Sequence, residues 1–466
     1  MPRHLACRDL AADPGLPYAC HVTRGPAIPP APPPSAAGAA LADWRDFASQ
    51  RYRPFRSLAV AQGFIAALSG PAIVIPLLLA LGAHPALATL LAVLPVIGTT
   101  AQRFIPQLLE RTDGNLRGLV VTAATIGEPR GLLLAGVVAL TAAGILPRWA
   151  AIAGVALIVG ALGSLGAVAY GSLQAWYQII LPDAERRLVA PRLAGIALGI
   201  GSVVLLPLAL TMDGTVTRIG LWAYVLPFSV AGVAGLVPAF LLRRIPSPGR
   251  VRVPKQRAAA VADDGRLRGL AQVITLASLA GGLAPFLSVY AIAVLHSGPG
   301  FAIAISATSS ATLVLSSIYV SSHLARGSSS RLLRRAMLLR SGALLLALAA
   351  HPANPLAALV LLVVAVLMAA GDTAGQLSAN ERLFRLATGP SVIAFQSRFV
   401  VRNVAAYAAG LLTGSGVMLI GGYGAFAALF VAAGSVRFWA ARVTQLSVRD
   451  LPGSETSVHA LSQPGR

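Results

Sequence analysis

Long runs of apolar residues, separated by short polar turns, fill most of the chain after residue 56. Each run is about 20 residues long, the length that a helix needs to cross a hydrocarbon core of ~30 Å. The runs lack the two-residue alternation of a strand, and only helices or closed barrels satisfy the backbone in lipid. The pattern therefore predicts an all-α integral membrane protein with twelve transmembrane helices. Their approximate ranges are 57–80, 86–106, 117–142, 149–173, 192–212, 219–241, 269–294, 300–321, 336–351, 355–378, 398–419 and 424–443.

A longer polar segment divides these spans six and six, and it holds eight basic residues. The residues before the first span include a Pro/Ala run, PAIPPAPPPSAAG, which cannot form a packed helix because proline lacks the N–H and clashes with the preceding turn. We therefore expect five parts: a flexible cytosolic tail, a six-helix bundle, a cytosolic linker, a second six-helix bundle and a C-terminal cytosolic tail. Their ranges are 1–56, 57–241, 242–268, 269–443 and 444–466.

The composition excludes an ordinary soluble domain. Only 11% of the residues are charged while 56% are hydrophobic, and the mean hydropathy is +0.74. The net charge of +21 is compatible either with nucleic-acid binding or with a membrane orientation signal. The arginines decide between them, because fifteen lie in the predicted short inner loops or in the adjoining ends of the spans, and two, Arg148 and Arg218, in the outer loops. This distribution predicts that both termini are cytoplasmic and that nucleic acid is not a partner.

An internal repeat relates the two groups of six spans. Four positions near the fourth and fifth spans have the same spacing as four positions near the tenth and eleventh spans, 206 residues later. The first set is Tyr170, Gln174, Gln178 and Arg192, and the second is Gln376, Asn380, Phe384 and Arg398. We expect two bundles with pseudo-twofold symmetry, an arrangement typical of secondary transporters.

The loop between the second and third spans resembles the signature loop of the major facilitator superfamily, G-x-x-x-D-R-x-G-R-R. Here Glu110 stands for the aspartate, Arg111 matches the arginine, Gly114 comes one residue late and the first glycine is missing. The second-half copy has Arg326 but no acid. The resemblance covers about residues 57 to 445 and implies that this loop locks one conformation during transport. The residues then expected to form a conformational gate are Glu110, Arg111, Arg326, Arg192 and Arg398; the alternative is that these loop charges only set the topology.

Few charged residues lie inside the predicted spans, where charge is costly. Asp372, Gln376 and Asn380 recur every four residues on one face of the tenth span, which borders the central cavity in the resembled family. Asp372 is therefore a candidate for coupling or cation recognition. The alternative is a carboxylate paired with Arg398 or Arg402.

Other polar positions give weaker candidates for substrate binding or coupling. Glu128 is a candidate for the same reason as Asp372, because it is a charged residue inside a predicted span. The alternative is a structural polar contact at a kink, since Glu128 and Arg130 flank Pro129. Tyr170 and Gln174 form a matching stripe in the fourth span, with helix–helix hydrogen bonding as the alternative. Gln62 and Tyr290 lie on spans that line the cavity in the resembled family. The serines and threonines of the eighth span are interpreted as close helix packing.

The sequence offers no catalytic, metal or cofactor site. Cys7 and Cys20 are the only cysteines, the histidines are scattered, and a phosphate loop of the form GxxxxGK[ST] is missing. We expect a secondary transporter that moves a small molecule by alternating access, with proton coupling as a further hypothesis and without an enzymatic activity. The alternatives are a non-transporting membrane sensor or scaffold and an integral-membrane lipid enzyme. The arginine-rich, lysine-poor composition suggests a bacterial inner membrane.

Overall fold

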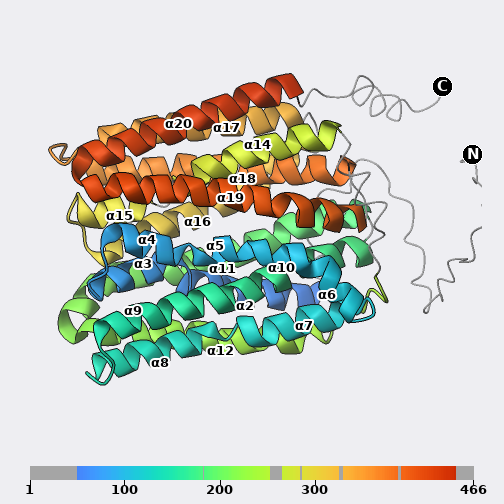
Figure 1. Cartoon of the computed structure of the whole chain (residues 1–466), viewed down its shortest axis with the longest axis horizontal. Coiled ribbons are helices and arrows are strands. Elements are labelled where there is room, and N and C mark those ends of the chain that lie inside the picture. Colours follow the sequence, from blue (N-terminus) through green and yellow to red (C-terminus); the bar gives the residue numbers. More distant parts are fainter. Residues whose placement is uncertain are drawn as a thin grey trace, which may run out of the picture. The chain divides into compact units, whose positions relative to one another are not determined.

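The computed structural model describes residues 50–181, 183–251, 265–283, 286–324, 329–386 and 390–447. Within these ranges every regular element is a helix, and the helices lie alongside one another (Figure 1). Ten helical segments of this part of the chain are long and apolar enough to cross a membrane. The all-α membrane architecture expected from the sequence is confirmed at this level.

The described residues before 252 form helices that are often interrupted within one predicted span. A 3₁₀ turn, η1 (Gln50–Tyr52), precedes the first long helix, and η3 (Ile158–Leu162) is π-helical. The remaining elements are α2 (Arg53–Leu68), α3 (Pro71–Ala80), α4 (Pro85–Ala92), α5 (Leu94–Gly98), η2 (Thr99–Phe104), α6 (Ile105–Arg111), α7 (Leu116–Gly127), α8 (Arg130–Ala142), α9 (Arg148–Leu157), α10 (Gly163–Ile180), α11 (Asp183–Ile219), η4 (Gly220–Tyr224) and α12 (Val225–Leu242).

The described residues after 264 form fewer and longer helices. They are α14 (Gly265–Gly282), α15 (Phe286–Ala293), α16 (Pro299–Leu324), α17 (Ser329–Leu346), η5 (Ala347–Ala349), α18 (Ala357–Leu386), α19 (Pro390–Ile420) and α20 (Gly422–Ser447). We refer to residues 50–251 as the N-terminal half and to residues 265–447 as the C-terminal half.

The ten apolar segments differ from the twelve predicted spans at two places. One segment, Arg192–Leu242, is 51 residues long and contains both the fifth and the sixth predicted spans, joined through η4. The ninth predicted span corresponds to α17, which is not among the ten because it carries four arginines: Arg331, Arg334, Arg335 and Arg340. Helix α17 nevertheless packs against α18 and α20.

Several predicted spans are broken, the first, third and seventh among them. The first span divides into α2 and α3 at Ser69 and Gly70, with Pro71 opening the second piece. Proline suits the first position of a helix because its missing N–H would have no helical partner there. The third span divides at Pro129 into α7 and α8, and the seventh divides between α14 and α15.

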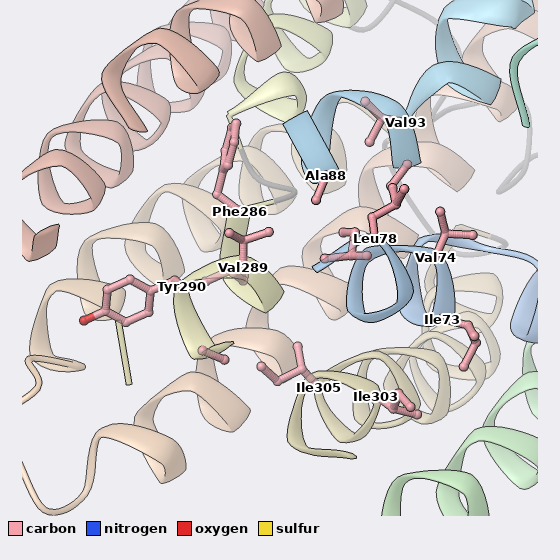
Figure 2. Packing of buried hydrophobic residues seen from close by; sticks show 14 of the residues in the cluster. Ile73, Val74, Leu78, Ala88, Val93, Phe286, Val289, Tyr290, Ile303 and Ile305 are labelled. Carbon is pink, nitrogen blue, oxygen red and sulfur yellow. The ribbon is translucent and has the colours of Figure 1, made fainter. Parts of the chain in front are cut away.

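The main apolar core joins the two halves at one end of the helices. Figure 2 labels members of this one buried cluster from three helices: Ile73 and Leu78 of α3, Phe286 and Val289 of α15, and Ile305 of α16. All five side chains are buried. The arginine distribution predicts that this end faces outward. A second core cluster contains only residues of the C-terminal half, from α14, α17, α18, α19 and α20.

Candidate functional site

A cavity of about 430 Å³ lies between the two halves. Its N-terminal wall comes from both pieces of the broken first span, from the turn after α4, and from α5 and α11. Its C-terminal wall comes from α15, α16 and α19. The break in the first span lies at the cavity, because Ala66 and Ala67 of α2 and Pro71 and Ala72 of α3 all line it.

The wall of this cavity is apolar apart from five hydroxyl groups, all from the C-terminal half. They belong to Ser288, Ser306, Ser309, Ser310 and Tyr407. Ser306 and Ser309 donate hydrogen bonds to carbonyl groups of their own helix, at 3.5 and 2.9 Å. Among the described residues, Ser288, Ser310 and Tyr407 have no side-chain hydrogen-bond partner. These three hydroxyls are free to bind a molecule in the cavity.

A polar contact joins the two halves beyond the predicted outer end of the cavity. Asp213 of α11 accepts a hydrogen bond of 2.6 Å from the backbone N–H of Gly300, in the first turn of α16. A Cβ on Gly298 would lie 2.5 Å from the same carboxylate, so this approach requires glycine there. The positive end of the helix dipole favours a carboxylate at this position. Helices α11 and α16 also pack along each other. Asp213 was not predicted from the sequence.

The predicted stripe on the tenth span lies on α18. Asp372 forms an ion pair with Arg340 of α17, a different partner from the Arg398 or Arg402 considered from the sequence. Gln376 and Asn380 follow on the same helix with exposed side chains. None of the three is in the lining of the cavity. Their predicted role in substrate binding or coupling stays a prediction.

The other predicted binding residues also lie outside that lining. Gln62 sits one helical turn before Ala66 on α2, the same face that meets the cavity, and is half-buried. Tyr170 of α10 has an exposed side chain close enough to bond Gln174. Tyr290 is fully buried, packs edge-on against Phe426 and Phe430, and donates a hydrogen bond to the carbonyl of Ala350.

Glu128 and Arg130 lie on either side of the Pro129 break, as the sequence implies. A Cβ on Gly166 of α10 would lie 3.3 Å from a terminal nitrogen of Arg130 and 3.9 Å from Oε1 of Glu128. Both side chains therefore reach α10, and Arg130 also donates to the hydroxyl of Ser69 at 3.3 Å. The pair links the third span to the first and fourth spans.

The signature-like loop is tied to the segment that follows α12. Val251 donates a 2.9 Å backbone hydrogen bond to Gly114, Arg117 donates to the carbonyl of Arg243, and the buried indole of Trp176 donates to the carbonyl of Pro246 at 2.9 Å. Residues 243–251 belong to the segment predicted as a cytosolic linker, and these hydrogen bonds connect them to the N-terminal half.

The predicted gate residues are spread over several elements. Glu110 and Arg111 are exposed at the end of α6, and Arg192 is half-buried in α11. Arg398 belongs to α19, but its side chain lies outside the described residues, as does the whole of Arg326. The structure brings Glu110 and Arg111 next to the turn at Asp113 and Gly114, and the gating role stays a prediction.

Replacing Gly114 by alanine is expected to destabilise the protein more than the same change at Gly82. Both glycines have positive φ, of 76° and 90°, so both substitutions carry backbone strain of ~1–2 kcal/mol. A Cβ at Gly114 would in addition lie 2.7 Å from the carbonyl oxygen of Val251, while nothing lies within 4 Å of one at Gly82. Thermal unfolding of the purified variants measures the difference. Equal losses would show that the contact with Val251 contributes nothing.

The helical architecture described above is similar to that of several solved membrane transporters. The fold is that of the major facilitator superfamily. A bacterial homologue of the iron transporter ferroportin, solved in an outward-facing state with soaked iron, matches with a TM-score of 0.62 and 16% identity over 86% of this chain and 100% of that one. The xylose transporter XylE from E. coli, in a partially occluded inward-open conformation, matches with a TM-score of 0.63 and 13% identity over 87% and 100%.

The nucleoside transporter NupG matches with a TM-score of 0.57 and 12% identity over 86% of this chain and 100% of that one. No protein-family model and no curated protein sequence matches the chain. The structural neighbours are transporters. At identities of 12–16%, the likeness shows the fold and not the substrate.

Proposed function

We propose that this protein is a secondary transporter that carries a small, uncharged molecule across the membrane by alternating access. The observation that carries the proposal is the cavity, whose walls come from both halves of the chain. Alternating access requires such a shared site, because the halves must separate on one side of it and then on the other. The likeness to three solved transporters supports the same conclusion.

The arrangement that we propose has twelve spans in two bundles of six. The 51-residue apolar segment is about 76 Å long as a helix, more than twice the ~30 Å of a hydrocarbon core, so it supplies two spans. Helix α17 supplies the remaining span, because three of its arginines are exposed near its start and the fourth, Arg340, pairs with Asp372 of α18. The first helix of each bundle is then among the broken ones, and broken helices are a feature of transporter binding sites.

The cavity lining favours an uncharged substrate that combines an apolar surface with hydroxyl or amide groups. Apolar walls would exclude water from such a molecule, and the hydroxyls of Ser288, Ser310 and Tyr407 would orient it. Nucleosides and xylose, which the nucleoside transporter NupG and the xylose transporter XylE carry, belong to this class, whereas the iron of the ferroportin homologue does not. We therefore place a polar, uncharged metabolite ahead of a metal ion.

Two carboxylates, Asp372 and Glu128, are the candidates for proton coupling. Asp372 is already paired with Arg340, which leaves it less free to bind a substrate cation. Glu128 has Arg130 nearby but forms no ion pair within 4 Å among the described residues, so Glu128 is the better candidate of the two. Its position at a helix break that contacts α10 would let a change in charge act on the packing of the bundle.

The test is exchange by the purified full-length protein in liposomes. Vesicles preloaded with one unlabelled compound from a panel of nucleosides, sugars and neutral amides would receive the same labelled compound outside. We expect accumulation of at least one labelled compound above the level in protein-free liposomes. Properly folded protein that exchanges no member of the panel would contradict an uncharged polar substrate.

A further inference from the structure

Arg437 of α20 is completely buried, with an exposed fraction of 0%. None of its three guanidinium nitrogens has a hydrogen-bond partner, and the Nε of Arg340 is likewise buried and without one. Guanidinium groups are almost never buried unless they are paired. Four buried nitrogen atoms of two arginines therefore lack the acceptors that they need.

The two arginines lie at the same level of the C-terminal half. Ser341 of α17 donates a 2.8 Å hydrogen bond to the carbonyl of Gly434, one turn before Arg437 on α20. A Cβ on Gly371 of α18 would lie 2.4 Å from Cγ of Arg340, which pairs with the neighbouring Asp372. Arg437 is within electrostatic reach of both Arg340 and Asp372. We call these three residues the arginine cluster.

The arginine cluster holds two positive charges and one negative charge between α17, α18 and α20. Asp372 satisfies only part of one guanidinium, so one positive charge is left over in the interior of the bundle. An isolated buried charge costs several kcal/mol even after relaxation. An acceptor with one negative charge would remove this cost and satisfy the free N–H groups.

We propose that the arginine cluster binds one small monovalent anion against the guanidinium of Arg437. The excess charge is one, so a monovalent ion neutralises it while a divalent ion would overcompensate. The ion must be small, because Arg437 has no exposed surface. A halide of the size of chloride meets both conditions. The site belongs to the C-terminal half alone, lies apart from the cavity lining, and does not depend on the proposed transport function.

The test compares the thermal stability of the purified protein in sodium chloride and in sodium gluconate at the same ionic strength. Gluconate has the same charge but is too bulky for an enclosed site. We expect chloride to raise the unfolding midpoint by roughly 1–2 °C, with a plateau as the site saturates. The same midpoint in both salts would overturn the proposal.

Two variants assign the effect to Arg437. In Arg437→Met the cost of the buried charge is gone, so we expect a higher midpoint than wild type in gluconate and no response to chloride. The matched control is Arg442→Met on the same helix, an exposed arginine that stacks on Phe438 and should keep the full chloride response. A chloride response that persists in Arg437→Met would place the anion elsewhere. If that variant does not fold, the wild-type comparison alone decides.

Discussion

Replacing Ser309 by tryptophan is expected to reduce transport to the level of protein-free liposomes. Ser309 lines the cavity from α16 and is half-buried, so its side chain has open space in front of it. An indole at this position would occupy the space that a substrate needs. It would also prevent the two halves from packing together as they do in the structure. The measurement is exchange of the compound that the wild-type protein accumulates, with purified variant in liposomes.

The control for Ser309→Trp is Leu315→Trp on the same helix. Leu315 is 70% exposed and is absent from the cavity lining, so the larger side chain displaces nothing inside the protein. We expect this variant to keep nearly the wild-type exchange rate. Full activity of Ser309→Trp would show that the substrate does not pass through the cavity, and the proposed site would be wrong.

Replacing Asp213 by alanine is expected to open the predicted outer end of the cavity. The variant loses the hydrogen bond from Gly300 and the favourable interaction of the carboxylate with the first turn of α16. Together these contribute on the order of 1–2 kcal/mol, which corresponds to a change of roughly 5- to 30-fold in the ratio of closed to open molecules. Asp213→Asn keeps an acceptor without the charge and should fall between wild type and alanine.

A reporter cysteine in the cavity measures this change. In a chain with Cys7 and Cys20 replaced by serine, Ser310→Cys places one thiol in the cavity lining. A membrane-impermeant maleimide added to the outside should label this thiol faster by about the same factor when Asp213 is alanine. Thr215→Val is the control, because Thr215 lies on the same helix and bonds only the carbonyl of Thr211. An unchanged labelling rate in the alanine variant would show that Asp213 does not help to close the outer end of the cavity.

The sequence predicts the membrane architecture well, because twenty-residue apolar runs leave few other structures for the chain. It places a break at Pro129, and the structure has one there. The division of the first span at Ser69 and Gly70 was not predicted, since an apolar run continues on both sides of it. Helix α17 shows the limit of composition, because Arg340 pairs with Asp372 of α18, a partner that a local window does not see.

The cavity was harder to predict than the fold. Sequence reasoning looked for charged and amide side chains in the spans, and it interpreted the serines of the eighth span as packing residues. In the structure Ser306, Ser309 and Ser310 line the cavity. These three serines share one face of one helix, and this pattern could have indicated a polar lining. Which face of the helix meets the other half, however, depends on how the helices pack. The same holds for Asp213 and Arg437, whose surroundings come from other helices.

A cavity walled by carbon and hydroxyl groups also has an electrical consequence. The field across a membrane does work of about 2.3 kcal/mol on each elementary charge moved through 100 mV. The residues that line this site bear no such charge for it to act on. If the two halves reorient around an uncharged passenger without a coupled proton, neither the loaded step nor the empty return step moves charge through this field. Cells would then set the direction of flux by concentration, and depolarising them would leave the rate unchanged.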